Sequence, residues 1–302
     1  MAIEQTPDGP KEIGAGFPFK SKYVEVLGSR MHYIDEGSGD PILFLHGNPT
    51  SNYLWRNIIP HVSGQGRCIA PDLIGMGKSD RPRITYTYED HVRYISAFVE
   101  ALGIGKNLTL VIHDWGSMIG FLWAARNPQA VRAVAYMEAS MRPLSIKDMP
   151  GGLAVAFRMM RAPVTGWLMA GAANMLVRKL LPDLTQATMS PEIRKVYRDT
   201  YPTIASRRAI IRFPKEVPLD GKPEISVRNV EDYVKWLKET EVPKLLFYGD
   251  QGVAIKEAEI EWSKANLSNL TLYDLGQAKH FVQESHPHKI GKELSRWLSG
   301  LP

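Results

Sequence analysis

The sequence lacks the features that stabilise very small proteins or anchor proteins in membranes. Cys68 is the only cysteine among 302 residues, which excludes internal disulfides and any multi-cysteine zinc or iron–sulfur site. The most apolar stretch, Gly166 to Val177, is shorter than the roughly 18 residues of a membrane span. Residues 1–9 are polar and acidic, so no secretory signal is expected. We therefore expect a cytoplasmic protein without a membrane partner.

Positive charge is in small excess and is unevenly distributed along the chain. The 37 Lys and Arg residues oppose 32 Asp and Glu residues, which gives a net charge of +5. Residues 141–215 alone contain 13 basic and 4 acidic residues, a net charge of +9. These basic residues are dispersed and no nucleic-acid-binding motif lies among them, so we expect no nucleic-acid partner. A solvated basic surface is the favoured interpretation, and weak attraction of anions is the alternative.

The chain length suits one large α/β domain, or such a domain with an inserted subdomain. Short apolar segments alternate with helical patterns, and most are too continuously apolar to have one face in water, which is typical of parallel strands. The predicted strands are Ser21–Val26, Met31–Glu36, Pro41–His46, Arg67–Pro71, Leu108–His113, Ala133–Glu138, Lys244–Gly249 and Leu270–Leu275. The predicted helices are Asn52–Val62, Thr87–Leu102, Gly116–Arg126, Val230–Glu239, Ile255–Lys264 and Pro287–Leu298. This order predicts a doubly wound, mostly parallel, eight-stranded sheet whose first two strands are antiparallel.

The alternation of strands and helices stops after Glu138. About a hundred residues, up to Val242, contain helical patterns and several prolines but no convincing strand. We interpret residues 139–214 as an inserted helical cap on a main domain formed by residues 1–138 and 215–302. Seven of the twelve methionines lie between Met141 and Met189. They fill a core or line an adaptable apolar cavity, and the sequence leaves both interpretations open.

The most informative segment runs from the predicted strand Leu108–His113 into Asp114-Trp115-Gly116-Ser117. A strand followed at once by small residues that open a helix is typical of a nucleophile elbow, a tight turn that lifts one side chain off the sheet. The residue at the apex is Asp114, where serine or cysteine is more usual. Ile112 stands where the common motif has glycine, so the match is partial. The alternative is that Asp114 merely caps the following helix.

Two further segments follow predicted strands. His46-Gly47-Asn48 comes after Pro41–His46, where a turn usually contributes to an oxyanion hole; Asn48 as an ordinary turn former is the alternative. His280 follows the last strand, where a catalytic base is expected; a surface-loop histidine is the alternative. Ligands of open α/β sheets bind at the carboxyl ends of the strands, so these segments are expected to meet.

The acid that would orient His280 has two candidates. Asp250 immediately follows the seventh strand, but the usual acid position, three residues past Gly249, is occupied by Gly252. Glu138 ends the sixth strand, and a carboxylate closing so apolar a strand needs a partner because burying it unpaired is costly. We favour Glu138. His286 and His288 lack the cysteine or carboxylate partners of a metal site, so none is predicted there.

The segments His46–Ser51, Ala70–Ser79, His113–Gly116, Met137-Glu138 and His280–Glu284 resemble the haloalkane dehalogenases of the α/β-hydrolase superfamily. The resemblance covers nearly the whole chain and is loosest in the cap and before about residue 20. It implies that Asp114 is the nucleophile, His280 the base and Glu138 the acid. It also implies that Asn48 and Trp115 hold the halide through their side chains and the oxyanion through their backbone N–H groups. Ala278-Lys279 departs from the family, which has small or apolar residues before this histidine.

The chemistry that this resemblance implies is hydrolysis of a carbon–halogen bond to an alcohol, a halide ion and a proton, without metal or organic cofactor. Its only partners are a halogenated alkane and water, in a monomer or small homo-oligomer. The runner-up is an epoxide hydrolase, which needs acids to protonate the epoxide oxygen, and the predicted cap offers Tyr197 and Tyr201 four residues apart. A luciferase-like monooxygenase and a noncatalytic receptor on the same fold are the remaining alternatives.

Overall fold

The computed structural model describes residues 13–148 and 151–301. The expectation of no secretory signal, which concerns residues 1–9, lies outside the described residues, as does Met149 of the methionine-rich segment. None of the helices in the described part of the chain has the length and apolar character needed to cross a membrane.

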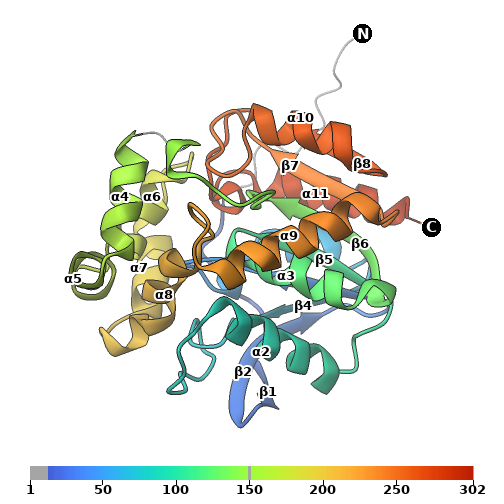
Figure 1. Ribbon diagram of the computed structural model, residues 1–302. Coiled ribbons are helices and arrows are strands. Elements are labelled where there is room, and N and C mark those ends of the chain that lie inside the picture. The colour runs from blue at the N-terminus through green and yellow to red at the C-terminus, as the bar shows by residue number, and fades with distance from the viewer. Residues whose placement is uncertain (1–12, 149–150, 302) are drawn as a thin grey trace.

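One eight-stranded sheet forms the centre of the molecule, in the order β1-β2-β4-β3-β5-β6-β7-β8 (Figure 1). The first two strands pair antiparallel with each other, β2 pairs antiparallel with β4, and all other neighbours are parallel. The strands are β1 Lys22–Val26, β2 Ser29–Glu36, β3 Pro41–Leu45, β4 Arg67–Pro71, β5 Leu108–His113, β6 Val131–Met137, β7 Lys244–Tyr248 and β8 Leu270–Asp274. The predicted sheet is therefore confirmed, with small shifts at the strand ends.

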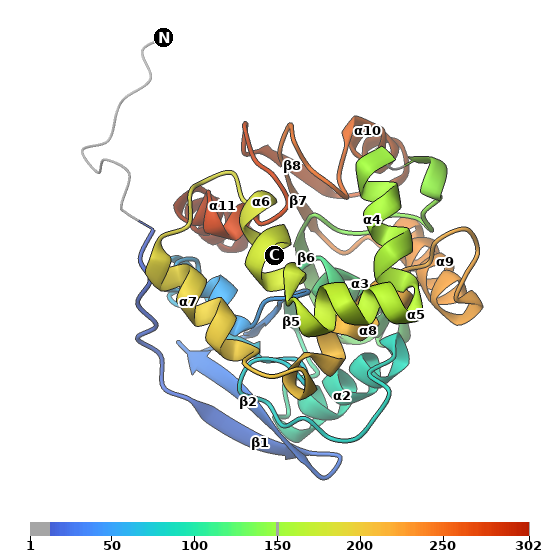
Figure 2. The same cartoon turned by 90° about the vertical axis from the view of Figure 1, so that its left-hand side faces the viewer.

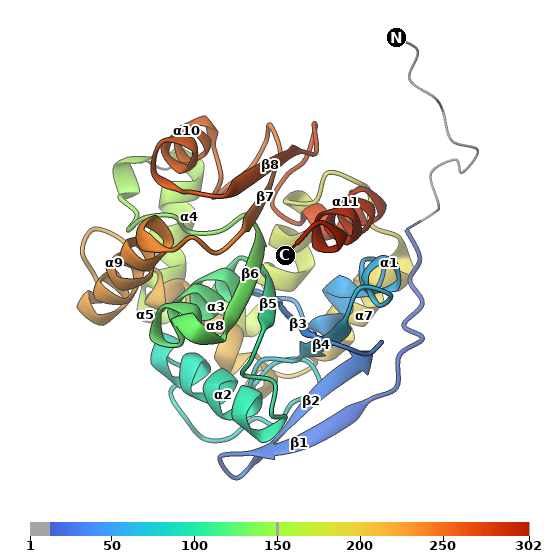
Figure 3. The ribbon, with the colours of Figure 1, turned by 90° about the vertical axis from the view of Figure 1, so that its right-hand side faces the viewer.

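Helices cover both faces of this sheet, as Figure 3 shows. Alternate side chains of a strand enter two separate cores: Leu43 and Leu45 of β3 join one, and Ile42 and Phe44 join the other. This period-2 division explains why the strands are continuously apolar. The first core is completed by α2 Tyr88–Ala101, α3 Trp115–Arg126 and α9 Glu224–Glu239, and the second by α1 Ile59–Val62 and α11 Pro287–Ser299. The helix α10 Glu257–Asn266 lies between β7 and β8 in the chain, and η2 Pro128–Ala130 precedes β6.

Two predicted helices differ from the structure. The single helix predicted over 52–62 is instead two short ones, η1 Asn52–Trp55 and α1. Pro60 explains the break, because it has no N–H to donate to the carbonyl of Arg56 and fits only in the first turn of a helix. The helix predicted from Val230 begins six residues earlier, at Glu224 directly after Pro223. Pro223 holds an extended conformation there and so sets the true start.

Residues 139–223 form a group of helices on one side of the sheet (Figure 2). Its elements are η3 Ile146–Asp148, α4 Gly151–Arg161, α5 Pro163–Gly166, η4 Trp167–Ala172, η5 Leu176–Leu180, α6 Leu181–Asp183, α7 Pro191–Thr200, η6 Ala205–Arg207 and α8 Arg208–Glu216. The segments η4 and η5 are π-helical. The described residues of this region contribute no strand to the sheet, and α8 continues two residues past position 214.

A buried ion pair of the main domain also bonds to this helical group. The two terminal guanidinium nitrogens of Arg56 contact the Glu284 carboxylate, at 2.6 and 2.8 Å, and both side chains are fully buried. Glu284 belongs to η7 Val282–Glu284, and its Oε1 also accepts a hydrogen bond from Tyr197 of α7 at 2.5 Å. Three segments that are distant in the sequence are thus connected through one carboxylate.

We expect Arg56→Met to lower the free energy of unfolding by about 3–5 kcal/mol, because it leaves the Glu284 carboxylate buried without its charge partner. Denaturant unfolding followed by circular dichroism measures this change. Lys179→Met is the matched control, since its ion pair with Asp183 is exposed and contributes little. Equal losses in the two variants would contradict the prediction.

Candidate functional site

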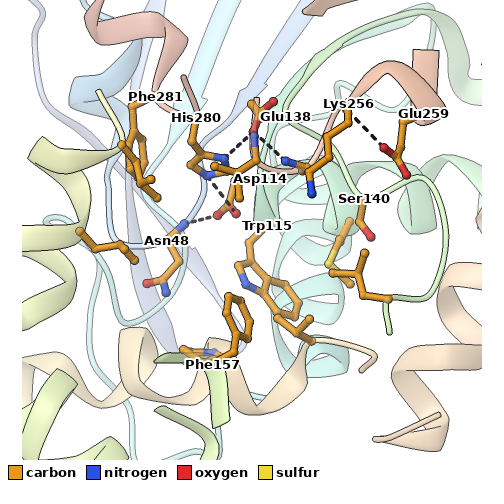
Figure 4. A pocket seen from close by; sticks show the side chains of 18 of the residues that line it. Asn48, Asp114, Trp115, Glu138, Ser140, Phe157, Lys256, Glu259, His280 and Phe281 are labelled. Carbon is orange, nitrogen blue, oxygen red and sulfur yellow. Dashed lines mark hydrogen bonds and ion pairs between the residues drawn. The ribbon is translucent and has the colours of Figure 1, made fainter. Parts of the chain in front are cut away.

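The predicted site residues meet at one cavity of about 390 Å³ at the carboxyl ends of the strands (Figure 4). Asn48 follows β3, Asp114 follows β5, Glu138 follows β6 and His280 follows β8. Trp115, the first residue of α3, completes the set. Segments that are far apart in the sequence are brought together here because parallel strands all end at the same edge of the sheet.

Asp114 occupies a tight turn between β5 and α3. Its backbone has φ 51° and ψ −122°, a conformation that is uncommon for a residue with a side chain. Gly116 permits the close approach, since a Cβ there would lie 2.1 Å from the carbonyl oxygen of Leu45. The Asp114 carboxylate does not cap α3, and Oδ1 instead accepts the backbone N–H of Asn48 at 2.7 Å. The helix-cap interpretation of Asp114 is therefore wrong.

His280 lies between two carboxylates. Its Nε2 is 3.5 Å from Asp114 Oδ2, and its Nδ1 is 2.9 Å from Glu138 Oε2. Glu138 is 3% exposed and its oxygens accept three successive backbone N–H groups, of residues 253–255, at 2.7–3.3 Å. These bonds supply the partners that a buried carboxylate requires.

The alternative acid, Asp250, is exposed on the loop after β7, and it is Glu138 that contacts His280. The structure explains why glycine, and not an acid, occupies position 252. A Cβ at Gly252 would lie 2.5 Å from Glu138 Oε1, so the absence of a side chain makes room for the carboxylate from β6.

The charged groups of Asp114, His280 and Glu138 shift the pKa values of Asp114 and His280. Burial alone would lower the pKa of His280, but the hydrogen bonds and negative charges of Asp114 and Glu138 outweigh burial and raise it well above the ordinary value. Burial would likewise raise the pKa of Asp114, yet the hydrogen bond and charge of His280 lower it. At neutral pH the pair is therefore an imidazolium and an ionised carboxylate.

Asn48 and Trp115 present their side-chain N–H groups to the same cavity. Asn48 Nδ2 donates to the Ile210 carbonyl of α8 at 3.3 Å, which leaves its second N–H unengaged by that bond. The indole N–H of Trp115 has no partner among the residues that the structure describes. Both groups are neutral donors, since neither side chain titrates.

The helix α8 holds Trp115 in place through an aromatic stack that the sequence did not reveal. Phe213 packs on the Trp115 ring with centroids 4.6 Å apart, and His91 stacks on the opposite side of Phe213 at 4.5 Å. Tyr88 meets Trp115 edge-on at 5.6 Å. Glu216, at the end of α8, accepts the backbone N–H of Tyr88 at 3.0 Å and so fixes α8 to α2.

Several cavity residues were not predicted. The apolar wall includes Leu176, Leu180 and Leu184, and their spacing of four residues was the available signal because it places them on one helix face. Among the described methionines of residues 141–189, Met160 is the one that lines the cavity. Lys279 does not line it: its ammonium group donates to the Asp183 carbonyl at 3.2 Å.

The two tyrosines of the epoxide hydrolase alternative do not face the cavity. Tyr197 donates to Glu284, and Tyr201 donates to the Thr50 carbonyl at 2.9 Å, both in buried positions. Neither hydroxyl is available to protonate a substrate. Over residues 13–148 and 151–301, no three His, Cys, Asp or Glu side chains gather in a way that could hold a metal ion.

Comparison with known proteins identifies the class and then the family. Residues 40–287 match the model of the alpha/beta hydrolase fold. A haloalkane dehalogenase of Agrobacterium fabrum is 39% identical over 93% of this chain and 92% of its own, and one of Mesorhizobium japonicum is 41% identical over 92% and 91%. The crystal structure of haloalkane dehalogenase DatA from Agrobacterium tumefaciens has a TM-score of 0.90 at 38% identity, covering 97% of this chain and all of its own.

Fold and site together thus define an α/β hydrolase with an aspartate at the elbow. The chain belongs to the haloalkane dehalogenase family. The epoxide hydrolase alternative is not favoured.

We expect Asp114→Asn to lower the pKa of His280, because it removes one of the two negative charges that stabilise the imidazolium. Titration of the histidine ring signals by NMR measures the shift. Asp250→Asn is the control and should leave the signal unchanged, since Asp250 is exposed and does not contact the ring. An unchanged pKa in Asp114→Asn would contradict the pairing.

Proposed function

We propose that this chain hydrolyses haloalkanes to an alcohol, a halide ion and a proton, with Asp114 as nucleophile, His280 as base and Glu138 as its orienting acid. The observation that carries the proposal is the Asp114 carboxylate, ionised beside His280 and flanked by the neutral N–H donors of Asn48 and Trp115. A carbon–halogen bond has no carbonyl to polarise, so it requires a charged nucleophile and donors for the departing anion.

In the first step, Asp114 Oδ2 attacks the carbon from the side opposite the halogen. A carbon–oxygen bond forms and the carbon–halogen bond breaks, with the electron pair leaving on the halide. Oδ1 is held by the backbone N–H of Asn48 at 2.7 Å, which leaves Oδ2 for attack. The Asn48 amide and the Trp115 indole N–H receive the halide, and because neither carries a positive charge they also release it.

The second step depends on the charge that the first step removes. Esterification neutralises Asp114, so one of the two carboxylates that raised the pKa of His280 is lost. His280 releases its proton to solvent, as the proton of the overall reaction, and then takes one from water, while Glu138 stabilises the imidazolium that re-forms. The hydroxide oxygen so formed attacks the Asp114 carboxyl carbon, and the backbone N–H groups of Asn48 and Trp115 stabilise the oxyanion. The bond between this carbon and the alkyl oxygen then breaks, the alkyl oxygen takes up the proton of the new carboxyl group, and the alcohol leaves with Asp114 ionised again.

Residues 139–214 act in this proposal as a cap that completes the cavity, with residues 1–138 and 215–302 as the main domain. Leu176, Leu180 and Leu184 of the cap supply apolar wall against the alkyl group. We also propose a cytoplasmic, monomeric or small homo-oligomeric enzyme. Cys68 is the single cysteine and is buried, so the chain cannot form an internal disulfide. This supports a cytoplasmic location, because disulfides are rare in that reducing compartment.

Incubation with 1,2-dibromoethane and with 1-iodobutane tests the activity, because hydrolysis releases halide and acid together. We expect both products in equal amounts with either substrate. Turnover of styrene oxide without halide release from either haloalkane would overturn the proposal in favour of epoxide hydrolysis.

His280→Phe should stop the reaction after the first step, because no base remains to activate water. We expect a covalent alkyl ester on Asp114, detected by peptide mass spectrometry after exposure to 1-iodobutane. The double variant Asp114→Asn/His280→Phe is the control and should remain unmodified. An ester elsewhere, or none in His280→Phe, would contradict the two-step scheme.

Glu138→Gln should lower kcat by at least about 100-fold, because the imidazolium loses its buried counter-charge in the hydrolytic step. Asp250→Asn should retain activity, since this exposed carboxylate does not contact His280. Steady-state kinetics with 1,2-dibromoethane compares the two, and the reverse order of effects would show that the wrong acid was chosen.

A further inference from the structure

The cavity has two chemically different walls. One is apolar and includes Phe157, Leu176 and Leu180, as displacement of halide from an alkyl chain requires. The other is polar: Ser140 and Arg142 come from the segment after β6, and Lys256 and Glu259 come from the start of α10. Figure 4 shows Ser140, Lys256 and Glu259 on the side of the cavity opposite Asn48. Nothing in the two-step reaction uses these charged groups.

The carboxylates of the cavity wall already have partners. Asp114 and Glu138 pair with His280. Glu259 Oε1 accepts from the Arg142 guanidinium at 3.2–3.3 Å, and Oε2 accepts the backbone N–H of Lys256 at 3.2 Å. Glu259 is 8% exposed, so these contacts supply the hydrogen-bond partners that a buried carboxylate requires.

Lys256 is the cation of this wall that lacks a counter-charge. Its ammonium group has no carboxylate within ion-pair distance in the described ranges 13–148 and 151–301. Its backbone is fixed at the residue before α10 by the bond to Glu259, and its side chain reaches toward the cavity (Figure 4). Lys256 is exposed, so it stands where the cavity meets solvent. A cation between an apolar wall and water attracts an anionic group of a ligand.

We propose that Lys256 forms a subsite for a carboxylate at the end of the substrate remote from the halogen, so that the enzyme accepts ω-haloalkanoates as a substrate class. This inference rests on the proposed function. The halogen end lies at Asp114, the alkyl chain packs on the apolar wall, and the carboxylate pairs with Lys256 at the mouth. The charge of the neighbouring Arg142 is already paired with Glu259.

The test compares kcat/KM for 6-bromohexanoate with kcat/KM for 1-bromohexane, two substrates with the same six-carbon chain. We expect the acid-to-alkane ratio to fall about tenfold in Lys256→Met, as expected for loss of one charge-assisted contact. Lys256→Glu should lower the ratio further by repulsion, and Lys256→Arg should preserve it. Lys279→Met is the matched control, since Lys279 bonds the Asp183 carbonyl outside the cavity and should not change the ratio.

The outcomes separate this inference from the proposed function. Bromide release from 1-bromohexane with a ratio that no Lys256 variant alters would overturn the carboxylate subsite alone. Absence of bromide release from both substrates would overturn the proposed function itself. An equal fall with 6-bromohexan-1-ol would also overturn the subsite, because it would show a response to polarity and not to charge. Circular dichroism of each variant verifies folding, and Lys256→Gln replaces Lys256→Met if the latter does not fold.

Discussion

The site depends on keeping the Asp114 carboxylate ionised at the end of the buried strand β5. Asp114 stays charged because His280 stands 3.5 Å away as a cation, and His280 stays charged because Glu138 faces it from the other side. Burial alone would raise the pKa of Asp114 and lower the pKa of His280, in both cases toward the neutral form. Three backbone N–H groups of the loop after β7 bond to Glu138, so this loop supports, through Glu138 and His280, the charge of Asp114, the proposed nucleophile.

The helical region encloses the cavity and also contacts two of the residues that line it, Asn48 and Trp115. One helix, α8, contacts both proposed halide donors: the Ile210 carbonyl accepts from the Asn48 amide, and the Phe213 ring packs on Trp115. Glu216 fixes the same helix to the start of α2. A change in the position of α8 would therefore displace Asn48 and Trp115 together.

The sequence predicted those parts of the molecule that are encoded locally. Most of the eight strands follow from continuous apolar segments, and Asn48, Asp114, Glu138 and His280 follow strand ends, so topology alone brings them together. The stack of His91, Phe213 and Trp115 was not predictable, because it joins three helices through contacts that no spacing encodes. The sequence also could not predict which way the Tyr197 side chain points, because its hydrogen-bond partner, Glu284, is 87 residues away.

The placement of positive charge along the cavity follows from the needs of an anion-releasing reaction. A lysine or arginine beside the halide would hold the product through its full charge, whereas the amide of Asn48 and the indole of Trp115 offer only dipoles. Among the described residues that line the cavity, Lys256 is the cation without a carboxylate partner and lies on the side opposite Asn48, whereas His280 and Arg142 are paired with carboxylates. In this arrangement a cation can select the far end of a substrate without slowing release of the halide, because the two ends of the ligand meet different electrostatic environments.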